Sequence, residues 1–308
     1  MPDPNRVLIT GANGHLGRRL IARLAPNVPI VAAVRSTAAR RAIERIAAPM
    51  EIAELDYGDA AALAAAANGC AAAVHLVGIL KENAANRYVD AHERATEALV
   101  TAARAGGLRR IVYVSILGSD PNSRNAALAS KGRAERILLA SGVATVILRV
   151  PMVLGEEDYA SQALRRRAHS RVAFLARGKS LEQPIYAGDV VDAIVAGIEL
   201  PAQGNVVLDL AGPESLSRAD LVRRAGACIG TRPRCVSLPL APVLGVAWLA
   251  ERLLANPPVT PAMLEVLDHD DRIDPAPAAA KLGIRLTSLD EMLRRCVDGA
   301  GNAAAAHP

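Results

Sequence analysis

Short apolar runs alternate along the chain with longer segments in which apolar residues recur every three or four positions. We expect strands at the apolar runs, which cover residues 6–10, 28–34, 51–55, 71–77, 110–115 and 143–150. We expect helices at the segments between them, which cover residues 14–25, 60–67, 89–105 and 126–140. The run at 28–34 is apolar throughout, as a parallel strand buried on both faces requires. This alternation predicts an α/β fold built on a doubly wound parallel sheet.

The second half of the chain is less regular and predicts a smaller C-terminal α/β lobe. We expect a strand at 204–210, a helix capped by Ser217 that runs to Cys228, and a helix capped by Asp189 that runs to Leu200. We therefore divide the chain into a first domain of residues 1–150, a smaller lobe of residues 151–297 interleaved with it, and a disordered tail of residues 298–308. A length of 308 residues with 51% hydrophobic content is enough for such a core.

Composition narrows the classes of partner. The net charge is +5 and only 2% of the residues are aromatic, which argues against nucleic-acid binding and fits small anionic ligands or an anionic membrane surface. The four cysteines show neither a paired nor a metal-ligand spacing, so we expect free thiols in a reducing compartment and no metal. We find no signal peptide and no apolar run of the ~20 residues that a membrane span needs, and we expect a cytoplasmic protein.

A glycine-rich segment joins the first expected strand to the first expected helix. Its residues are Thr10, Gly11, Ala12, Asn13, Gly14, His15, Leu16 and Gly17. Gly11 permits a sharp turn, Gly14 lets a pyrophosphate approach the backbone, and Gly17 allows the helix to pack close to the strand. The start of the helix adds unpaired N–H groups and a partial positive charge. In this strand–turn–helix context the segment predicts a dinucleotide site, and a glycine-rich turn without a ligand is the alternative.

The residue after the second expected strand indicates which dinucleotide is bound. Folds specific for NAD usually carry an acidic residue there, which binds the ribose 2′-hydroxyl. This chain has Arg35 instead, and a 2′-phosphate would meet positive charge and a planar guanidinium at that position. From the glycine-rich segment to the next acidic residue, Glu44, the chain carries six arginines: Arg18, Arg19, Arg23, Arg35, Arg40 and Arg41. We expect four of them, Arg19, Arg23, Arg40 and Arg41, on solvated helix faces. We therefore predict NADP(H) rather than NAD(H). We also expect Gly78 to end the fourth strand at a point where the backbone passes close to the cofactor.

The glycine spacing, G-x-x-G-x-x-G, resembles the nucleotide loop of the extended and atypical branches of the short-chain dehydrogenase/reductase superfamily. The resemblance implies that the loop residues bind the dinucleotide and that Asp56 lies beside the adenine. It also implies that Ser115 orients a substrate carbonyl and that Lys131 holds the nicotinamide ribose. In this family a tyrosine four residues before the lysine donates the proton, because that spacing places both side chains on one helix face. Ala127 occupies that position here, so hydride transfer to an ordinary ketone lacks its acid.

Other interpretations of these residues stay open. Ser115 could bond the local backbone at a strand end, and Lys131 could be a solvated helix lysine. A substitute proton donor could come from the second lobe, where Tyr159 and Tyr186 are candidates. His75 lies inside the expected fourth strand, and we expect a packed core histidine there rather than a catalytic base.

Later segments narrow the resemblance to one branch. They cover residues 76–80, 115–118, 130–132, 257–267 and 281–284. Together they are similar to atypical short-chain dehydrogenases related to the NADPH-binding accessory subunit of respiratory complex I, over residues 5–297. Relatives in that branch include bacterial stand-alone proteins and a protein tied to ubiquinone biosynthesis. The eukaryotic subunit is thought to bind NADPH without turning it over, which agrees with Ala127, but bacterial complex I lacks this subunit, so membership does not imply a place in that complex.

Two functions follow from this resemblance. The first is an NADP(H)-binding protein with a structural, sensing or assembly role near quinone or respiratory chemistry. The second is an NADPH-dependent oxidoreductase or isomerase of a quinone-like or lipid-like substrate, with a non-standard proton donor. Two segments bear on a peripheral contact with the inner membrane face or with a respiratory complex: the basic residues between 165 and 179, and the apolar stretch 238–255 with Trp248. For the basic segment the alternative is a solvated helix and loop. For the apolar stretch the alternatives are the lining of an apolar substrate cleft and a core helix of the lobe.

Overall fold

A computed structural model describes residues 5–83, 86–253, 260–266 and 270–298. The expected tail beyond residue 298, and part of the segment 257–267, lie outside the described residues. The chain forms two compact units, of which the first comprises Met1–Arg149 and Val190–Leu208 and the second comprises Val150–Asp189 and Asp209–Pro308. Residues 190–208, which the sequence analysis assigned to the smaller lobe, therefore belong to the first unit.

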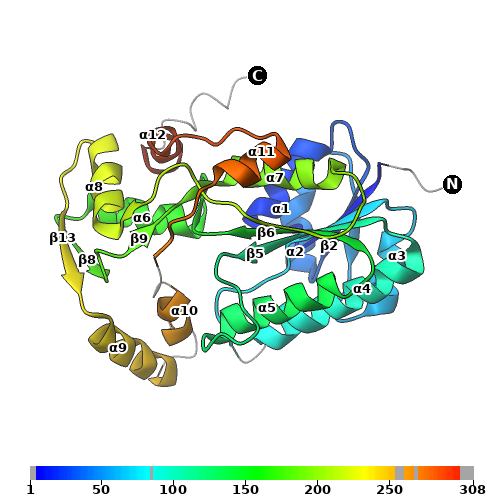
Figure 1. The fold of residues 1–308 in the computed structure, drawn as a ribbon, viewed down its shortest axis with the longest axis horizontal. Coiled ribbons are helices and arrows are strands. Elements are labelled where there is room, and N and C mark those ends of the chain that lie inside the picture. The colour runs from blue at the N-terminus through cyan, green and yellow to red at the C-terminus, as the bar shows by residue number, and fades with distance from the viewer. Residues whose placement is uncertain (1–4, 84–85, 254–259, 267–269, 299–308) are drawn as a thin grey trace. The chain divides into compact units, whose positions relative to one another are not determined.

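A seven-stranded sheet forms the centre of the first unit (Figure 1), with the strand order β11-β6-β5-β4-β1-β2-β3. The strands are β1 (Val7–Thr10), β2 (Ile30–Val34), β3 (Glu51–Glu54), β4 (Ala72–His75), β5 (Arg110–Ile116), β6 (Ala144–Val150) and β11 (Val206–Asp209). β1 pairs in parallel with both β2 and β4. From the neighbouring strands β1 and β4 the order therefore runs outward in two directions, through β2 and β3 on one side and through β5 and β6 on the other. This confirms the predicted doubly wound sheet, and such sheets bind ligands at the carboxyl ends of the strands where the order reverses.

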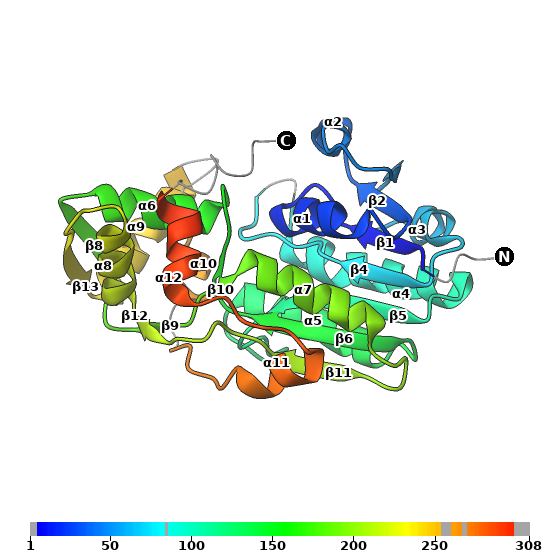
Figure 2. The same cartoon turned by 90° about the horizontal axis from the view of Figure 1, so that it is seen from above.

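Helices cover both faces of this sheet. They are α1 (His15–Leu24), α2 (Thr37–Glu44), α3 (Ala60–Ala67), α4 (Ala95–Gly106), α5 (Ala126–Leu139) and α7 (Ala187–Glu199). Figure 1 shows α3, α4 and α5 on one face and α1 and α7 on the other, and Figure 2 shows α7 lying along β5 and β6. Because both faces are covered, every residue of β1 and β2 is buried.

Local signals placed most helix ends correctly. Asp59 caps α3 as expected, since its carboxylate accepts hydrogen bonds from the backbone N–H groups of Ala61 and Ala62. Gly107, in the left-handed conformation with φ +70°, ends α4. The helix expected at 89–105 differs at its start, where residues Val89–Arg94 form a wider π-helical segment, η1, before α4 begins.

The expected role of Asp189 was wrong. Helix α7 begins at Ala187, directly after β10 (Ile185–Tyr186), so Asp189 lies inside the first turn rather than at the cap. Its carboxylate accepts hydrogen bonds from the backbone N–H and the hydroxyl of Thr287, both at 2.7 Å. A partner far along the chain, which no local pattern indicates, therefore determines what this carboxylate does.

The second unit combines three short strand pairs with small helices. Its strands are β7 (Val153–Leu154), β8 (Val172–Ala176), β9 (Leu181–Glu182), β10, β12 (Leu216–Ser217) and β13 (Arg234–Leu238). Its helices are α6 (Tyr159–His169), α8 (Arg218–Cys228), α9 (Leu240–Leu253), α10 (Pro261–Val266), α11 (Ala276–Leu282), α12 (Leu289–Leu293) and the π-helical η2 (Arg294–Asp298). Ser217 caps α8 as expected. The parallel pair β8–β13, in contrast, was not anticipated.

The apolar stretch with Trp248 forms α9, and its side chains are more exposed than a core helix allows. Val246 is 70% exposed, Trp248 is 48% exposed and Leu249 is 51% exposed. The interpretation as a core helix was therefore wrong for this face. In the described part of the chain, no helix combines the length and the apolar character that crossing a bilayer requires.

Candidate functional site

The glycine loop follows β1 at the carboxyl edge of the sheet, and its geometry requires glycine at two positions. Gly11 has φ +72°, and a Cβ there would lie 2.9 Å from the carbonyl carbon of Leu76. A Cβ on Gly17 would lie 2.5 Å from the carbonyl oxygen of Ala12. Both substitutions would force the backbone apart, since real Cβ atoms do not approach this closely. The first and third glycines therefore shape the turn and the packing of α1 on it.

The N-terminus of α1 has no cap from its own N-cap residue. Gly14 is the N-cap of α1 and, without a side chain, forms no capping hydrogen bond there. Asn13 and His15 are exposed and Leu16 is half-buried. The first N–H groups of α1 can therefore bind an anion, as helix N-termini do in dinucleotide sites. Thr10 differs from the other loop residues, because its hydroxyl faces the core, 2.7 Å from Nδ1 of His75.

Tyr57 holds this loop in place and was not anticipated as a site residue. Its hydroxyl accepts a hydrogen bond from the backbone N–H of Gly11 at 2.9 Å and donates one to the carbonyl of Ala33 at 2.8 Å. Burial of this phenol raises its pKa to about 12, so it stays protonated. The neighbouring Asp56 is exposed, and its carboxylate accepts a hydrogen bond from the backbone N–H of Gly58. The sequence did offer one signal for Tyr57: it directly follows Asp56, which was expected beside the adenine, and the chain has only five tyrosines.

Arg35 lies at the end of β2, where an acidic residue would favour NAD. Its guanidinium is exposed and donates a hydrogen bond to the side-chain oxygen of Asn86, which comes from the segment after β4. Other arginines of this region have partners elsewhere: Arg40 pairs with Glu44, and Arg23 with Asp192. Arg23 and Arg40 lie within helices α1 and α2, whereas Arg35 directly follows the central strand β2.

Lys131 is buried on α5, close to the carboxyl end of β5. It is 6% exposed, and its ammonium donates a hydrogen bond to the carbonyl of Val114 at 3.1 Å. The same nitrogen lies 4.5 Å from the centre of the Tyr113 ring. Burial lowers the pKa of Lys131 to about 8, while the charge of Glu135 opposes this shift. The interpretation as a solvated helix lysine is therefore wrong.

Gly78 and Ser115 both follow central strands and come close to this lysine in the chain's fold: Gly78 directly, and Ser115 through its neighbour Val114. A Cβ on Gly78 would come within 3.3 Å of Nζ of Lys131, so the backbone after β4 passes close to the ammonium. Ser115, which follows Val114, is 1% exposed, and its hydroxyl donates a hydrogen bond to Oγ of Ser119 at 3.2 Å. Ala127 is buried one helical turn before Lys131 and offers no hydroxyl. The fold thus brings Gly78 to Lys131 and leaves the position of the family's tyrosine without a proton donor.

Two histidines close to this region, His75 at the end of β4 and His92 in η1, are buried. The ring of His75 is fully buried, with Nδ1 near the Thr10 hydroxyl and Nε2 3.3 Å from the hydroxyl of Thr96. His75 is therefore the packed core histidine that we expected. His92, in η1, was not anticipated: its Nε2 accepts a hydrogen bond from the N–H of Ile79 at 3.2 Å. Burial lowers the pKa of His75 to about 3 and that of His92 to about 2, so both are neutral. His92 thereby fixes the turn that follows Gly78.

The two tyrosines considered as substitute donors belong to the second unit. The hydroxyl of Tyr186 donates a hydrogen bond to a carboxylate oxygen of Glu156 at 2.6 Å. Burial and this hydrogen bond raise the pKa of Tyr186, which makes it a weaker acid. Tyr159 is 51% exposed on α6. A catalytic role for either residue stays a prediction.

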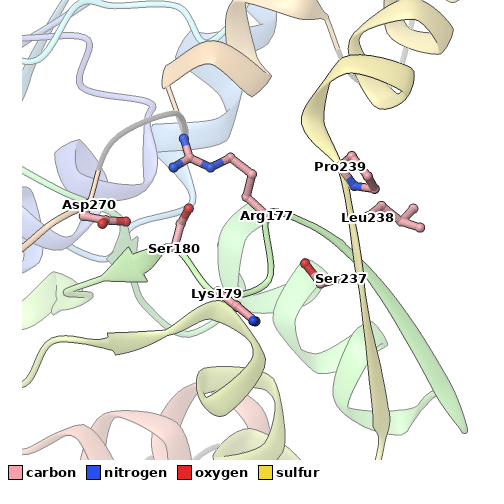
Figure 3. A pocket seen from close by; sticks show the side chains of 7 residues that line it. All are labelled: Arg177, Lys179, Ser180, Ser237, Leu238, Pro239 and Asp270. Carbon is pink, nitrogen blue, oxygen red and sulfur yellow. The ribbon is translucent and has the colours of Figure 1, made fainter.

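A cavity of about 440 Å³ lies within the second unit (Figure 3). Its lining comes from the segment between β8 and β9, from the end of β13, and from the residues before α11: Arg177, Lys179, Ser180, Ser237, Leu238, Pro239 and Asp270. Cationic and anionic groups both face it. Asp270 already accepts a hydrogen bond from the backbone N–H of Leu181.

Comparison with known proteins agrees with this geometry. A family described as NAD(P)H-binding matches residues 11–194, so the chain belongs to the NAD(P)H-binding family of Rossmann-fold proteins. Within it, the chain has the relatives expected of the atypical short-chain dehydrogenases. A ceramide reductase of Caulobacter vibrioides is 28% identical over 250 residues, 80% of this chain and 77% of the relative.

Two further relatives bear on the branch. The NADH-ubiquinone oxidoreductase 40 kDa subunit of Neurospora crassa is 24% identical over 281 residues, 90% of this chain and 74% of the relative. Quinone oxidoreductase 2 of Escherichia coli is 32% identical over 147 residues, 46% of this chain and 47% of the relative. The solved NADPH complex of the E. coli quinone oxidoreductase has the same fold, with a TM-score of 0.69, 24% identity and coverage of 93% of this chain and 98% of that one. The expected branch is confirmed, and a nicotinamide dinucleotide is the cofactor.

Proposed function

We propose that this protein is an NADP(H)-dependent oxidoreductase that reduces quinone-like compounds, with Lys131 acting where the family's tyrosine is missing. The observation that carries the proposal is the buried ammonium of Lys131, one helical turn after Ala127. A pKa of about 8 leaves this group charged at neutral pH and more acidic than an ordinary lysine. It can therefore stabilise negative charge on a substrate oxygen and donate a proton to it.

The absence of the tyrosine limits which carbonyl substrates the protein can reduce. A bound nicotinamide supplies the hydride. Reduction of a ketone places charge on an alkoxide oxygen, which is strongly basic and needs a well-placed acid. Reduction of a quinone places charge on an aryl oxygen of phenol-like basicity, with a pKa of ~10 for its conjugate acid. The ammonium of Lys131 is an adequate acid for the second oxygen and a poor match for the first, which favours a quinone.

The hydroxyl of Ser115 completes the proposed substrate site. It lies next to Val114, the residue whose carbonyl binds Lys131, and its partner Ser119 is another neutral hydroxyl. A hydroxyl in such a pair can turn to donate to a substrate carbonyl without breaking an ion pair. The lysine and the serine would then polarise one oxygen together, with Lys131 supplying the charge.

The preference for NADP(H) is part of the same proposal. Arg35 extends from the end of β2, where the fold aims a residue at the ribose 2′ position. Its hydrogen bond to Asn86 orients one side of the guanidinium and leaves a planar fork for a phosphate. The loop residues from Thr10 to Gly17, together with Gly78 and Asp56, would hold the rest of the dinucleotide.

A second function is favoured by Ala127 itself. Without the tyrosine, the chain would bind NADPH and serve as a structural, sensing or assembly protein in contact with a respiratory complex or the inner membrane face. The name of the Neurospora relative, a subunit of NADH-ubiquinone oxidoreductase, supports this alternative. The exposed apolar residues of α9 supply a surface for such a contact.

One experiment separates the two functions. The protein is purified without added nucleotide, heat-denatured, and the released dinucleotide is identified by mass. A second sample is loaded with NADPH, and its absorbance is followed while a short-chain ubiquinone analogue is added. Oxidation of the bound NADPH that is lost in Lys131→Met supports the reductase.

The control is Lys281→Met, which removes an exposed lysine at the end of α11 and should leave the rate unchanged. Tight NADPH that resists oxidation by quinones would instead support the structural or sensing role. Oxidation of NADPH by a long-chain lipid ketone but not by quinones would overturn the assignment of the substrate class. Failure to bind either dinucleotide would overturn both functions.

A further inference from the structure

The second unit exposes an apolar helix face. Helix α9 turns the side chains of Val246, Leu249 and Leu253 outward, where all three are exposed. Their spacing of three and four residues places them on one face of the helix. Trp248, the only tryptophan of the chain, is exposed next to them, and the guanidinium carbon of Arg252 lies 3.9 Å from the centre of its ring. The exposed side of α9 is therefore apolar, with one arginine stacked on its tryptophan.

A second apolar face lies on the strand pair β8–β13, and β13 leads into α9 (Figure 1). Ala173 and Leu175 of β8 are buried in a cluster with residues of α6 and α8. Because side chains alternate along a strand, Val172 and Phe174 point to the opposite face, where they are 42% and 63% exposed. Val236 of β13 pairs with Phe174 and extends this face. We call this surface the outer face of β8–β13, and it carries the only phenylalanine of the chain.

The segments that form these two faces are rich in cations and poor in carboxylates. Residues 159–181, which include β8, and residues 221–250, which include β13 and most of α9, contain neither Asp nor Glu. Two of their cations, Arg223 and Arg224, pair with carboxylates from outside these segments. The other lysines and arginines of the two segments are Arg165, Arg166, Arg167, Arg171, Arg177, Lys179, Arg232 and Arg234. These segments therefore combine exposed apolar side chains with positive charge.

Two of these cations lie beside the start of α9. Arg177 and Lys179 line the cavity of about 440 Å³ together with Leu238 and Pro239, the last residues before α9 (Figure 3). Asp270 also lines this cavity, and its carboxylate accepts a backbone hydrogen bond. Two cations thus face one anion at the beginning of an exposed apolar helix. Cations next to exposed apolar side chains are typical of surfaces that contact anionic lipids.

We propose that the exposed face of α9 and the outer face of β8–β13 bind the surface of a membrane that contains anionic phospholipids. Trp248, Leu249 and Phe174 enter the headgroup region, and the cations contact lipid phosphates. With 14 residues, α9 is shorter than the ~20 residues that span a bilayer, so it lies in the plane of the interface. A second copy of the chain is a poorer occupant, because it would bring the same cations together across the contact. This contact rests on the second proposed function, whose partner it names as lipid, and it does not depend on quinone reduction.

The first test is flotation of the full chain, loaded with NADP⁺, with lipid vesicles. Vesicles of phosphatidylglycerol and phosphatidylcholine should bind the protein at least tenfold more tightly than vesicles of phosphatidylcholine alone. Raising the salt concentration from about 0.1 to about 0.5 M should weaken the binding severalfold, since salt screens the attraction between the cations and the phosphates. Because Trp248 is the only tryptophan, its emission reports on α9 directly: it should shift to the blue on vesicles and be quenched by brominated lipid.

Variants then assign the binding to the two faces. Phe174→Asp on β8 and Leu249→Asp on α9 should each weaken vesicle binding at least tenfold, because each places a carboxylate against anionic lipid. Val207→Asp, at an exposed valine of β11 in the first unit, is the matched control and should change binding less than twofold. Lys179→Ser should weaken binding by ~5-fold, the share of one basic residue at an anionic surface. Lys281→Ser, at an exposed lysine of α11, should change it less than twofold.

Three results would overturn the proposal. They are equal binding to vesicles with and without phosphatidylglycerol, Trp248 emission that vesicles leave unchanged, and wild-type affinity in folded Phe174→Asp or in folded Leu249→Asp. The second result needs no variant, so it decides the matter if the substituted chains do not fold. Self-association of the wild type without lipid, lost in Leu249→Asp, would instead assign the face to a second copy of the chain. Oxidation of NADPH by a water-soluble quinone, measured without vesicles, tests the proposed reaction separately, so either proposal can fail alone.

Discussion

The two ends of the proposed dinucleotide site differ in how completely they match the family. At the glycine end, the backbone itself requires Gly11 and Gly17, and the N-cap of α1 is Gly14, which has no capping side chain. At the nicotinamide end, Gly78, Ser115 and Lys131 are present, but Ala127 replaces the proton donor. Both ends belong to the same unit and the same sheet.

This difference shows that binding and chemistry are separable in this fold. In the proposed site, binding of the dinucleotide would be distributed over many backbone groups, whose positions depend on packing and on the absence of Cβ atoms. Proton donation depends on one atom of one side chain. A single substitution can therefore remove the usual chemistry while leaving the binding geometry intact, and the remaining buried charge of Lys131 then determines what reaction is feasible.

The largest effect is expected from the charge at the nicotinamide end. Lys131→Met should reduce kcat/KM for quinone reduction by ~100-fold, as removal of a charge-stabilising group does in other enzymes. In the wild type the rate should fall as pH rises through about 8, because the ammonium loses its proton there. A pH–rate profile measures this, and a profile flat between pH 6 and 10 would contradict the role of Lys131.

Lys131→Met should increase the stability of the fold, although it should lower the activity. The pKa of Lys131 is about 8 in the folded state and ~10.4 in the unfolded chain, so below pH 8 the fold carries the full cost of a buried charge. Lys131→Met should then raise the free energy of unfolding at pH 7 by ~1–3 kcal/mol. Between pH 8 and 10 the unfolded chain binds more protons, so wild-type stability rises and the difference shrinks. Urea unfolding at pH 7 and pH 10 measures it; a constant difference would be inconsistent with this pKa.

A methyl group at the glycine end should be the next most damaging change. Gly17→Ala places a Cβ 2.5 Å from the carbonyl of Ala12, and overpacking of this kind costs ~1–3 kcal/mol. We expect at least tenfold weaker NADPH binding and a lower melting temperature. Gly245→Ala is the matched control, since nothing lies within 4 Å of its Cβ. Equal NADPH affinity in both variants would mean that Gly17 does not determine the loop.

The arginine at the ribose should affect selectivity rather than overall binding. Arg35→Ala should weaken NADPH binding by ~10-fold, the loss of one charge-assisted phosphate contact, and leave NADH binding within twofold. Arg41→Ala removes another exposed arginine of the same region and should change neither. Fluorescence titration with both dinucleotides measures the ratio. An unchanged ratio in Arg35→Ala would place the 2′-phosphate elsewhere.

The smallest effect is expected from the hydroxyl that supports the loop. Tyr57→Phe removes the bonds to Gly11 and Ala33 and should cost ~1–3 kcal/mol of stability, with a severalfold loss in NADPH affinity. Tyr159→Phe, at an exposed tyrosine, is the control. Thermal unfolding with and without NADPH distinguishes the two contributions. No change in either quantity would show that the loop holds its shape without the phenol.

Much of the fold was predictable because its signals are local. Apolar runs and helical periodicity located the strands of the central sheet, and Asp59 and Ser217 capped the helices that follow them. The glycine spacing predicted a dinucleotide loop, and the residue four positions before Lys131 is an alanine where the family has its tyrosine. Each of these depends on residues within about one turn or one strand of each other, where sequence and geometry are closely coupled.

The tertiary structure decided what depends on residues far apart in the chain. Tyr57 reaches Gly11 across 46 positions, and Thr287 reaches Asp189 across 98. Two further features depend on the packing of whole elements: the burial that lowers the pKa of Lys131, and the place of residues 190–208 in the first unit. The sequence by itself determined the fold class, the place of the glycine turn between strand and helix, and the alanine at the position of the family's tyrosine. Only the tertiary structure decided which side chains lose contact with water, because burial is a property of all the surrounding chain.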